Sequence, residues 1–581
     1  MGASARRTCI VIIQLAALSW ATQVALQRTA GSNDHCHIPS SEDVDLCRWR
    51  FDIPLSSSNT TSNFIFDGVS SLLQEWGNTH YRSGHNIVPA TMPTGTLLYH
   101  GTYRNVTPTT PEWVALDPEL SYMFCRAVEE GKGCYHLTLS TTRPLNLLYF
   151  DGNSAAKLHG CMDAQDLIVW GDVDPDRLFK EDERINRLCE WGKQYKLDGF
   201  LRMQANFEIM LCDFRSGVEQ VSFLNLINQG PALPPGAPPP KMPRLKQYPM
   251  WMFHYLESGH RYKHFPGETR VKLDLSKLVS FYDSDLFPSL STPRIEYERW
   301  QHRVNALSKP DREQLLERLD EVLKAESGGS GVDWTSLYRV VIHRYADRLE
   351  LLQYMLHGSH INTTSTTNRD TPRAEKIAKD VHEYAASLLT AYVLNDVRPR
   401  HDTKHPFSWA SPVFEHCATT HTKFILHSLH LTSSERLLLK AVNDVLHEIC
   451  RVVVGIWAEG MEIGLQSQDK ASFEEVVAKW KGEMDVLVKW LDWSVWVKCK
   501  PECGYEETCY LPTFPFFRCP DGTWPTSLSS QPGVSGFEAA YEDGEPCKNT
   551  SSNGAVVPEY EWIRPQPRCI RRLRPLETLG W

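Results

Sequence analysis

The sequence predicts an α+β protein made of a mixed α/β segment, a mainly helical segment and a cysteine-rich end. Between residues 61 and 228, short strand-like runs such as TGTLLYH, YHLTLST and FEIMLCDF are separated by helical or turn pieces. From 249 to 498, the apolar residues recur mostly with the 3.6-residue period of an α-helix. From 499 to 581 there is little periodicity and much proline, glycine and cysteine, which indicates loops stapled by disulfides.

Residues 1–21 have the features of a secretory signal peptide. Arg6 and Arg7 precede an apolar run, and the Ser-Trp-Ala at 19–21 offers a small-residue cleavage pattern. No later segment approaches the roughly 18 to 20 apolar residues that cross a bilayer. The longest one, 451–460, is predicted to be a buried helix. We therefore expect a secreted, extracellular protein without a membrane span.

Cysteine usage agrees with export, because disulfides persist in oxidising compartments. The sixteen cysteines, fifteen once Cys9 is removed with the signal peptide, fall into groups that suggest disulfides within modules. The groups are Cys36 and Cys47 in a polar N-terminal segment (22–60); Cys125, Cys134, Cys161, Cys189 and Cys212; Cys417 and Cys450; and six between Cys499 and Cys569. Irregular spacing favours disulfides over zinc for Cys499, Cys503, Cys509 and Cys519, so no metal is expected and the pairing stays open. The sequons at Asn59, Asn105, Asn362 and Asn549 are typical of a glycoprotein.

Charge and motifs exclude several classes of function. The formal net charge of −10 argues against nucleic-acid binding, which requires a clustered basic face. The sequence holds no phosphate-binding loop, no dinucleotide-binding glycine fingerprint and no Gly-x-Ser-x-Gly elbow. Four histidines in 416–430 are predicted to lie on a partly exposed helix face and not to bind metal. Ser154 and Lys157 are three residues apart, as in many surface helices, and nothing indicates a Ser-Lys nucleophile.

A proline-rich segment divides the chain. PALPPGAPPP at 231–240 has six prolines in ten residues, so we expect a stiff linker over 229–248. Beyond it a strand is predicted over 271–283. Ser308 is predicted to cap one helix, and Thr432 with a glutamate three residues later is predicted to begin another.

The stretch LLYHGTYRN at 97–105 begins a group of residues that suggests a ligand site. An apolar strand there runs directly into His100 and a glycine. Further on, the short strand Trp-Val-Ala is followed by a helix on which Ser121 and Phe124 stand three residues apart, hence on one face. Glu208 opens an apolar strand, which is unusual for a core position and suggests a side chain directed into a cleft.

In this order, residues 97–214, about a fifth of the chain, resemble the ADP-ribosyltransferase fold with its split sheet. The closest branch is that of diphtheria toxin and the poly-ADP-ribose polymerases, whose triad is His-Tyr-Glu. In that family an aromatic residue of the second strand precedes a serine by eight positions and a stacking tyrosine by eleven. Trp113, Ser121 and Phe124 keep both spacings, with tryptophan in place of the triad tyrosine.

The resemblance implies that NAD is the substrate, with a protein acceptor or water. His100 would bind the adenosine ribose, while the backbone of Gly101 and the hydroxyl of Ser121 would hold the carboxamide. Phe124 would stack on the nicotinamide, where an aromatic face suits a cationic ring. Glu208 would bind the second ribose and stabilise the positive charge that develops as the nicotinamide leaves. With Trp113 completing the triad, this predicts an NAD-dependent transferase or NAD glycohydrolase.

The alternative is a non-enzymatic secreted or wall-associated binding protein that keeps a degenerate form of this fold. On this interpretation His-Gly-Thr is a plain turn, and Ser121 and Phe124 are a capping serine and a core aromatic. Glu208 would then pair with Arg202 or another base on the surface. Over its whole length the sequence also resembles secreted fungal proteins without a known activity, in pieces such as DGNSAAK and GFLRMQANFEIMLCDF.

Overall fold

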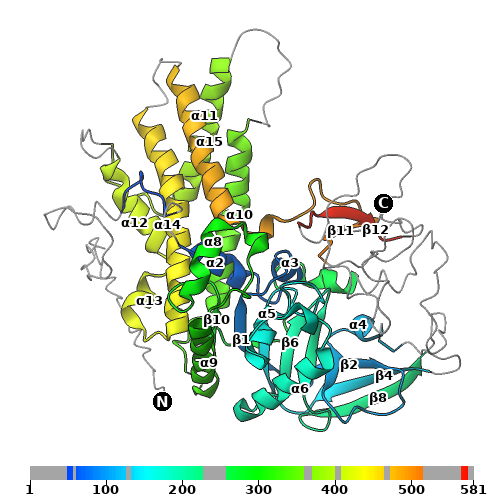
Figure 1. Cartoon of the computed structure of the whole chain (residues 1–581). Helices are drawn as coiled ribbons and strands as arrows, with labels where there is room; N and C mark the ends of the chain where they lie inside the picture. The colour runs from blue at the N-terminus through cyan, green and yellow to red at the C-terminus, as the bar shows by residue number, and fades with distance from the viewer. Residues whose placement is uncertain are drawn as a thin grey trace, which may run out of the picture. The chain divides into compact units, whose positions relative to one another are not determined.

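The strands of the first half of the chain form one ten-stranded sheet (Figure 1). The computed structural model describes residues 49–55, 60–122, 124–125, 133–226, 257–326, 328–358, 370–399, 407–463, 471–513 and 564–573. The sheet order is β10-β1-β5-β6-β7-β3-β2-β4-β8, and β9 also pairs with β1. The strands are β1 (Asn86–Met92), β2 (Leu97–Thr102), β3 (Glu112–Ala115), β4 (Cys134–Thr141), β5 (Leu145–Phe150), β6 (Gly199–Met203), β7 (Phe207–Leu211), β8 (Val218–Leu226), β9 (Lys272–Leu273) and β10 (Val279–Ser280).

Helices cover the sheet and make up most of the described residues in the second half of the chain. They are α2 (Ser62–Ser70), α3 (Glu75–Thr79), α4 (Pro118–Tyr122), α5 (Asp163–Val169), α6 (Glu181–Gly192), α8 (Ser291–Glu296), α9 (Lys309–Lys324), α10 (Trp334–Leu356), α11 (Asp370–Leu389), α12 (Ser411–Thr419), α13 (Lys423–Ser428), α14 (Ser433–Glu462) and α15 (Ala471–Leu491). Helices α10, α11, α14 and α15 pack side by side (Figure 1). The predicted α+β class, with a mainly helical second half, is confirmed.

Two helix starts follow the predicted capping pattern. The side chain of Ser308 accepts the backbone N–H of Asp311 at the start of α9. Thr432 forms a capping box with Glu435 at the start of α14, in which each side chain binds the other residue's backbone. Both predicted starts are confirmed.

Two hydrophobic clusters lie on opposite faces of the sheet. In β7, Phe207, Ile209 and Leu211 belong to one cluster and Met210 belongs to the other. Successive strand residues point to opposite faces, so the alternation in β7 separates the clusters. The first cluster includes residues of α10 and α14, and the second includes residues of α5, α6 and α9. Because both faces are covered, β6 and β7 are buried along their whole length.

All strand pairs described in this sheet are antiparallel except β5–β6, which is parallel. Parallel neighbours need a crossover connection. The connection from β5 to β6 carries α5 and α6, and it places these helices against the second cluster.

The sheet also includes strands from beyond the proline-rich segment. β9 and β10 both pair with β1. They occupy only parts of the strand predicted over 271–283, because the 3-10 turn Leu275–Lys277 separates them. The chain divides into the units Met1–Arg48 and Trp49–Trp581, so the described residues on both sides of the predicted linker belong to one unit. The signal peptide (1–21), most of the polar segment (22–60) and the linker (229–248) lie outside the described residues.

Disulfides are present in both halves of the chain. The described bonds are Cys125–Cys134, Cys189–Cys212, Cys417–Cys450, Cys499–Cys509 and Cys503–Cys569. The last two staple a small antiparallel sheet of β11 (Glu507–Tyr510) and β12 (Arg568–Arg571). Cys161 is buried as a free thiol. Among the described helices, none is long and apolar enough to cross a membrane.

Candidate functional site

His100, the first predicted site residue, lies in β2 and is held by its neighbours. Its Nδ1 donates a hydrogen bond of 2.7 Å to the carbonyl oxygen of Trp113. Its ring packs edge-on against Phe214, with 5.5 Å between the ring centroids. Burial lowers the pKa of His100, although the bond to the Trp113 carbonyl opposes the shift. Only 8% of the residue is exposed, so the imidazole is part of the packed framework.

Gly101 is predicted to face a ligand, but its close neighbour is the backbone of helix α4. A Cβ atom on Gly101 would lie 1.9 Å from the backbone oxygen of Ser121. The Ser121 hydroxyl is also occupied, since its oxygen lies 3.0 Å from the Pro118 carbonyl oxygen and 2.6 Å from Nε2 of His136. The bare glycine therefore lets α4 pack on β2, where the resemblance predicts a carboxamide.

Glu208 forms an ion pair inside the protein. Its Oε1 accepts a hydrogen bond of 2.7 Å from Nε of Arg202, the directly opposite residue on β6. Glu208 is 9% exposed and Arg202 is 1% exposed. The partner Arg202 that the alternative interpretation predicts is confirmed, but the pair is buried and not on the surface.

The sheet register places Glu208 and His100 on opposite faces. Tyr99 pairs with Ala115, and Ala115 pairs with Glu208, so these three side chains share one face. His100 is the neighbour of Tyr99 along β2 and points to the other face. Trp113 shares the face of Glu208, and its buried indole nitrogen has no hydrogen-bond partner among the described residues. Phe124 is 60% exposed beyond α4.

The predicted constellation of His100, Trp113, Ser121, Phe124 and Glu208 therefore does not line one cleft. The spacing of these residues along the sequence matches the order of strands and helix. The sheet face on which a side chain lies depends on the register of the paired strands, since a shift of one residue moves it to the other face. The number of residues between two motifs does not determine this register.

Glu208 belongs to a larger buried network of charged side chains between α5, α6 and β6. The other charged members are Asp166, Glu181, Arg184 and Arg202. Glu181 bridges the two arginines, bonding Arg184 with one oxygen and Arg202 with the other. Burial opposes the ionisation of Glu181, but the charges of Arg202, Lys157 and Arg184 outweigh it and hold the pKa at about 2. Because these charged side chains form ion pairs and hydrogen bonds with one another, the network joins α6 to the sheet.

A second polar cluster, which we name the loop junction, is not among the sites predicted from the sequence. It is formed by residues 80–86, 151–154 and 294–303. The first segment enters β1 and the second leaves β5, and these two strands are antiparallel partners, so their ends meet. The runs HYRSGHN and DGNS could have signalled the junction, because polar residues that flank two apolar strands mark loops at the same edge.

Asp151 ties two segments of the loop junction together. Its Oδ1 accepts the backbone N–H groups of His85 and Asn86 at 2.6 and 2.7 Å, and its Oδ2 accepts the Asn86 side-chain amide at 2.6 Å. Burial raises the pKa of Asp151 to about 6, although these bonds oppose the shift. Ser154 follows in the same loop and donates to the Phe150 carbonyl at 2.8 Å, so its hydroxyl is engaged with backbone.

Arg299 connects the loop junction with the helical half. Its guanidinium bonds Asp67 of α2 at 2.7 Å and Asp492 at 3.3 Å. It also lies over the ring of Tyr81, 4.1 Å from the centroid. The Tyr81 hydroxyl in turn donates to Asp492 at 2.6 Å.

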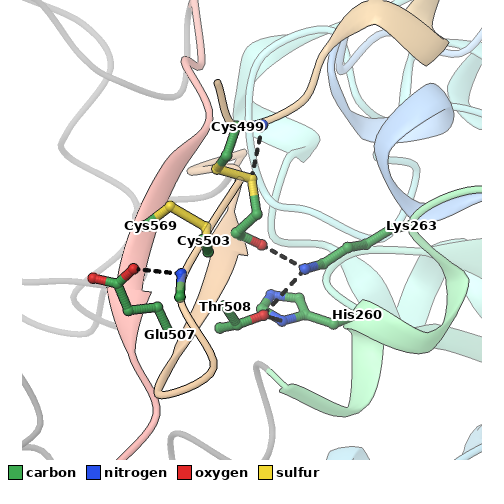
Figure 2. The surroundings of a disulfide bond; sticks show 9 residues. His260, Lys263, Cys499, Cys503, Glu507, Thr508 and Cys569 are labelled. Carbon is green, nitrogen blue, oxygen red and sulfur yellow. Dashed lines mark hydrogen bonds between the residues drawn. A yellow bond between two sulfur atoms is a disulfide. The ribbon is translucent and has the colours of Figure 1, made fainter. Parts of the chain in front are cut away.

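The disulfide-stapled pair β11–β12 contacts His260 and Lys263 through Thr508 (Figure 2). Lys263 donates to the hydroxyl of Thr508 at 3.2 Å and to the backbone oxygen of Cys509 at 2.5 Å. Nδ1 of His260 lies 3.1 Å from the same hydroxyl. Burial lowers the pKa of Lys263 to about 8, although the nearby carboxyl of Glu75 opposes the shift.

Metal-ligand spacing occurs in one place among the described residues. The sulfur atoms of Cys499, Cys503 and Cys569 lie within 4.8 Å of one another. All three belong to disulfides, which leaves no thiolate there to bind zinc.

Comparison with known proteins gives a family and two relatives. A family model described as the YPL277C N-terminal domain matches residues 51–136 and 129–242. The uncharacterized protein YOR389W of Saccharomyces cerevisiae is 23% identical over 575 residues, covering 81% of this chain and 85% of that protein. The uncharacterized protein YPL277C of the same yeast is 31% identical over 249 residues, covering 33% of this chain and 50% of that protein. None of these descriptions names an ADP-ribosyltransferase.

Proposed function

We propose that the protein is an exported glycoprotein that acts by binding a partner outside the cell and does not consume NAD. In this proposal its N-terminal module is a degenerate form of the ADP-ribosyltransferase fold. The observation that carries the proposal is the position of Glu208, which is paired with Arg202 on the face of the sheet opposite His100. A carboxylate that stabilises a developing cation must face the substrate, and here it faces a guanidinium.

Two observations support export. Ten of the described cysteines form five disulfides, and bonds of this kind are rare in a reducing cytosol. The predicted glycosylation site at Asn105 is exposed in the loop after β2, where an oligosaccharide has room. We infer wall association as the concrete form of this proposal, because two relatives are yeast proteins and a yeast cell is enclosed by a wall.

The test of export and binding uses the full chain expressed in a secreting yeast. We expect the protein to be recovered from the washed wall fraction or the medium, to lose mass on glycosidase treatment and to have no more than one free thiol for the described cysteines. Binding is measured as retention on washed, protein-free cell walls, with a secreted protein of similar size as the control. Recovery as a reduced, unglycosylated protein inside the cell would exclude the proposal.

The NAD-consuming function implied by the resemblance is the rival proposal, and it makes a different prediction. It requires Glu208 to act on the ribose, so Glu208→Gln would reduce nicotinamide release by on the order of a hundredfold or more. We expect no release above buffer from the oxidised parent protein and no change in Glu208→Gln.

Glu219→Gln is the matched control, since Glu219 is exposed on the edge strand β8. The melting temperature of each variant separates loss of activity from loss of folding. Release by the parent and by Glu219→Gln, but not by folded Glu208→Gln, would overturn the binding proposal and establish an enzyme.

A further inference from the structure

Arg294 of α8 is a buried cation that has neither a hydrogen bond nor an ion pair with the described residues. Only 3% of the residue is exposed. None of its guanidinium nitrogens, Nε, Nη1 and Nη2, has a hydrogen-bond partner among the described residues. A buried charge is normally paired and hydrogen-bonded, because an unpaired one loses its hydration without compensation.

Two other arginines of the loop junction are paired with carboxylates, unlike Arg294. Arg299 bonds Asp67 and Asp492, as described above. Arg303 holds both oxygens of Asp163, each at 3.0 Å. In the described part of the chain, no carboxylate forms an ion pair with Arg294. Burial accordingly lowers its pKa, and the phenol of Tyr282 is the group that opposes this shift.

The described groups that interact with Arg294 are the aromatic ring of Tyr282 and the imidazoles of His85 and His302. Its guanidinium carbon lies 5.1 Å from the ring centroid of Tyr282. Burial lowers the pKa of His85 well below its usual range, and the charge of Arg294 lowers it further. Burial and the same charge lower the pKa of His302 to about 3. These side chains crowd a cation with groups that cannot neutralise it.

His85 provides a second unpartnered nitrogen beside the same tyrosine. Its ring stacks on Tyr282, with 4.3 Å between centroids and an interplanar angle of 15°. Its Nδ1 donates to the carbonyl oxygen of Ser83 at 2.9 Å. Its Nε2 is buried and has no partner within the described residues. In the neutral ring this nitrogen is a hydrogen-bond acceptor.

We propose that Arg294 and His85 are the protein ligands of a small oxyanion held inside the loop junction. The guanidinium would donate parallel hydrogen bonds to two oxygen atoms, the geometry that Arg offers to carboxylate and phosphate. His85 would accept a hydrogen bond from a protonated oxygen of the same ion, as hydrogen phosphate provides. The site is independent of the proposed wall binding, and it assigns a role to the polar run that precedes β1.

The experiment measures the melting temperature of the full chain after long incubation, because Arg294 and His85 are buried. Sodium phosphate, sulfate and acetate are titrated at constant ionic strength against sodium gluconate, whose bulky anion is the baseline. We compare the parent with Arg294→Met, which keeps the length and removes the charge. The control is Arg348→Met on α10, which removes the charge of an exposed residue outside the loop junction.

At least one anion should raise the melting temperature of the parent and of Arg348→Met with a saturating dose dependence. Arg294→Met should need at least about tenfold more of that anion, the scale of losing a charge-assisted hydrogen bond. His85→Phe, which preserves an aromatic stack, should weaken binding less. Equal responses in the parent and Arg294→Met would show a general salt effect on the protein and overturn the proposal.

A second measurement covers the case in which Arg294→Met does not fold. The parent is purified, washed free of external salt and unfolded, and the released anions are quantified by ion chromatography. One equivalent of a single small oxyanion supports the site. Less than about a tenth of an equivalent of every anion, together with no dose dependence in the parent, overturns it.

Discussion

Gly101 shows how one residue fixes the position of a helix. The backbone oxygen of Ser121 occupies the place where a Cβ atom on Gly101 would be, 1.9 Å away. The neighbour is backbone, so it cannot move aside as a flexible side chain does. Gly482, in contrast, is exposed in α15, and a Cβ atom there would meet nothing within 4 Å.

We therefore expect opposite effects from the same substitution at these two glycines. Gly101→Ala should destabilise the protein by about 1 to 3 kcal/mol, the usual penalty of overpacking. Gly482→Ala should stabilise it by about 0.5 to 1 kcal/mol, because alanine loses less conformational freedom in a helix. Urea unfolding of both variants and the parent measures the difference. A neutral Gly101→Ala would mean that α4 does not pack on β2 as described.

At the scale of elements, the strands and the helix N-caps could be predicted from the sequence. The face of the sheet on which each side chain lies could not. The alternation in FEIML is visible in the sequence, and so is the capping pattern at Thr432. The side on which Glu208 stands depends on which residue of β3 lies opposite, and that register is set by long-range pairing. The strands that carry the candidate site were therefore predicted correctly, but the prediction that His100 and Glu208 share one cleft was wrong.

Helix α6 is joined to the sheet by Glu181, and this contact predicts an acid-sensitive stability. The pKa of Glu181 in the folded protein is about 2, below its ordinary value of 4.5. Since the folded state binds the proton less tightly than the unfolded chain, the stabilisation is complete above pH 4.5 and is lost as the pH falls towards 2. The lost contribution is on the order of 3 kcal/mol.

The measurement is the free energy of unfolding of the parent and of Glu181→Gln between pH 5 and 3. The variant should be less stable than the parent at pH 5, and the difference should shrink as the solution is acidified. Glu183→Gln on the same helix is the control, since Glu183 is exposed and outside the network. A constant difference between Glu181→Gln and the parent would contradict the assigned pKa.

At the scale of the whole molecule, residues before the proline-rich segment contact residues after it in several places. β9 and β10 pair with β1, and Arg270 donates to the backbone oxygen of Leu116 at 2.6 Å. The five described disulfides each join residues on one side of 227–256. The two sides are thus held by strand pairing, ion pairs and shared apolar packing.

A protease site inserted within 231–240 tests this arrangement. After complete cleavage we expect the two fragments to co-elute in gel filtration and to separate only in denaturant. Cleavage of a denatured sample followed by dilution provides the control for fragments that never associated. Separation of the native fragments under mild conditions would show that the contacts across the segment are weak.

The contacts between the loop junction and the helical half could not be predicted from the sequence, because the partners lie far apart along the chain. Arg299 meets Asp67 and Asp492, two carboxylates that lie 232 and 193 residues away along the chain. Only the complete fold brings these residues together. Sequence patterns reach over tens of residues, so they identify the loops and not their meeting place.

The pairing of β9 and β10 with β1 has a practical consequence for the production of fragments of this protein. A fragment that ends at residue 242, where the family match ends, would leave one edge of β1 without its neighbours. Exposed strand edges recruit other strands and promote aggregation. The N-terminal module should therefore be produced together with residues up to at least Ser280, or it will oligomerise through an edge that the intact protein keeps covered.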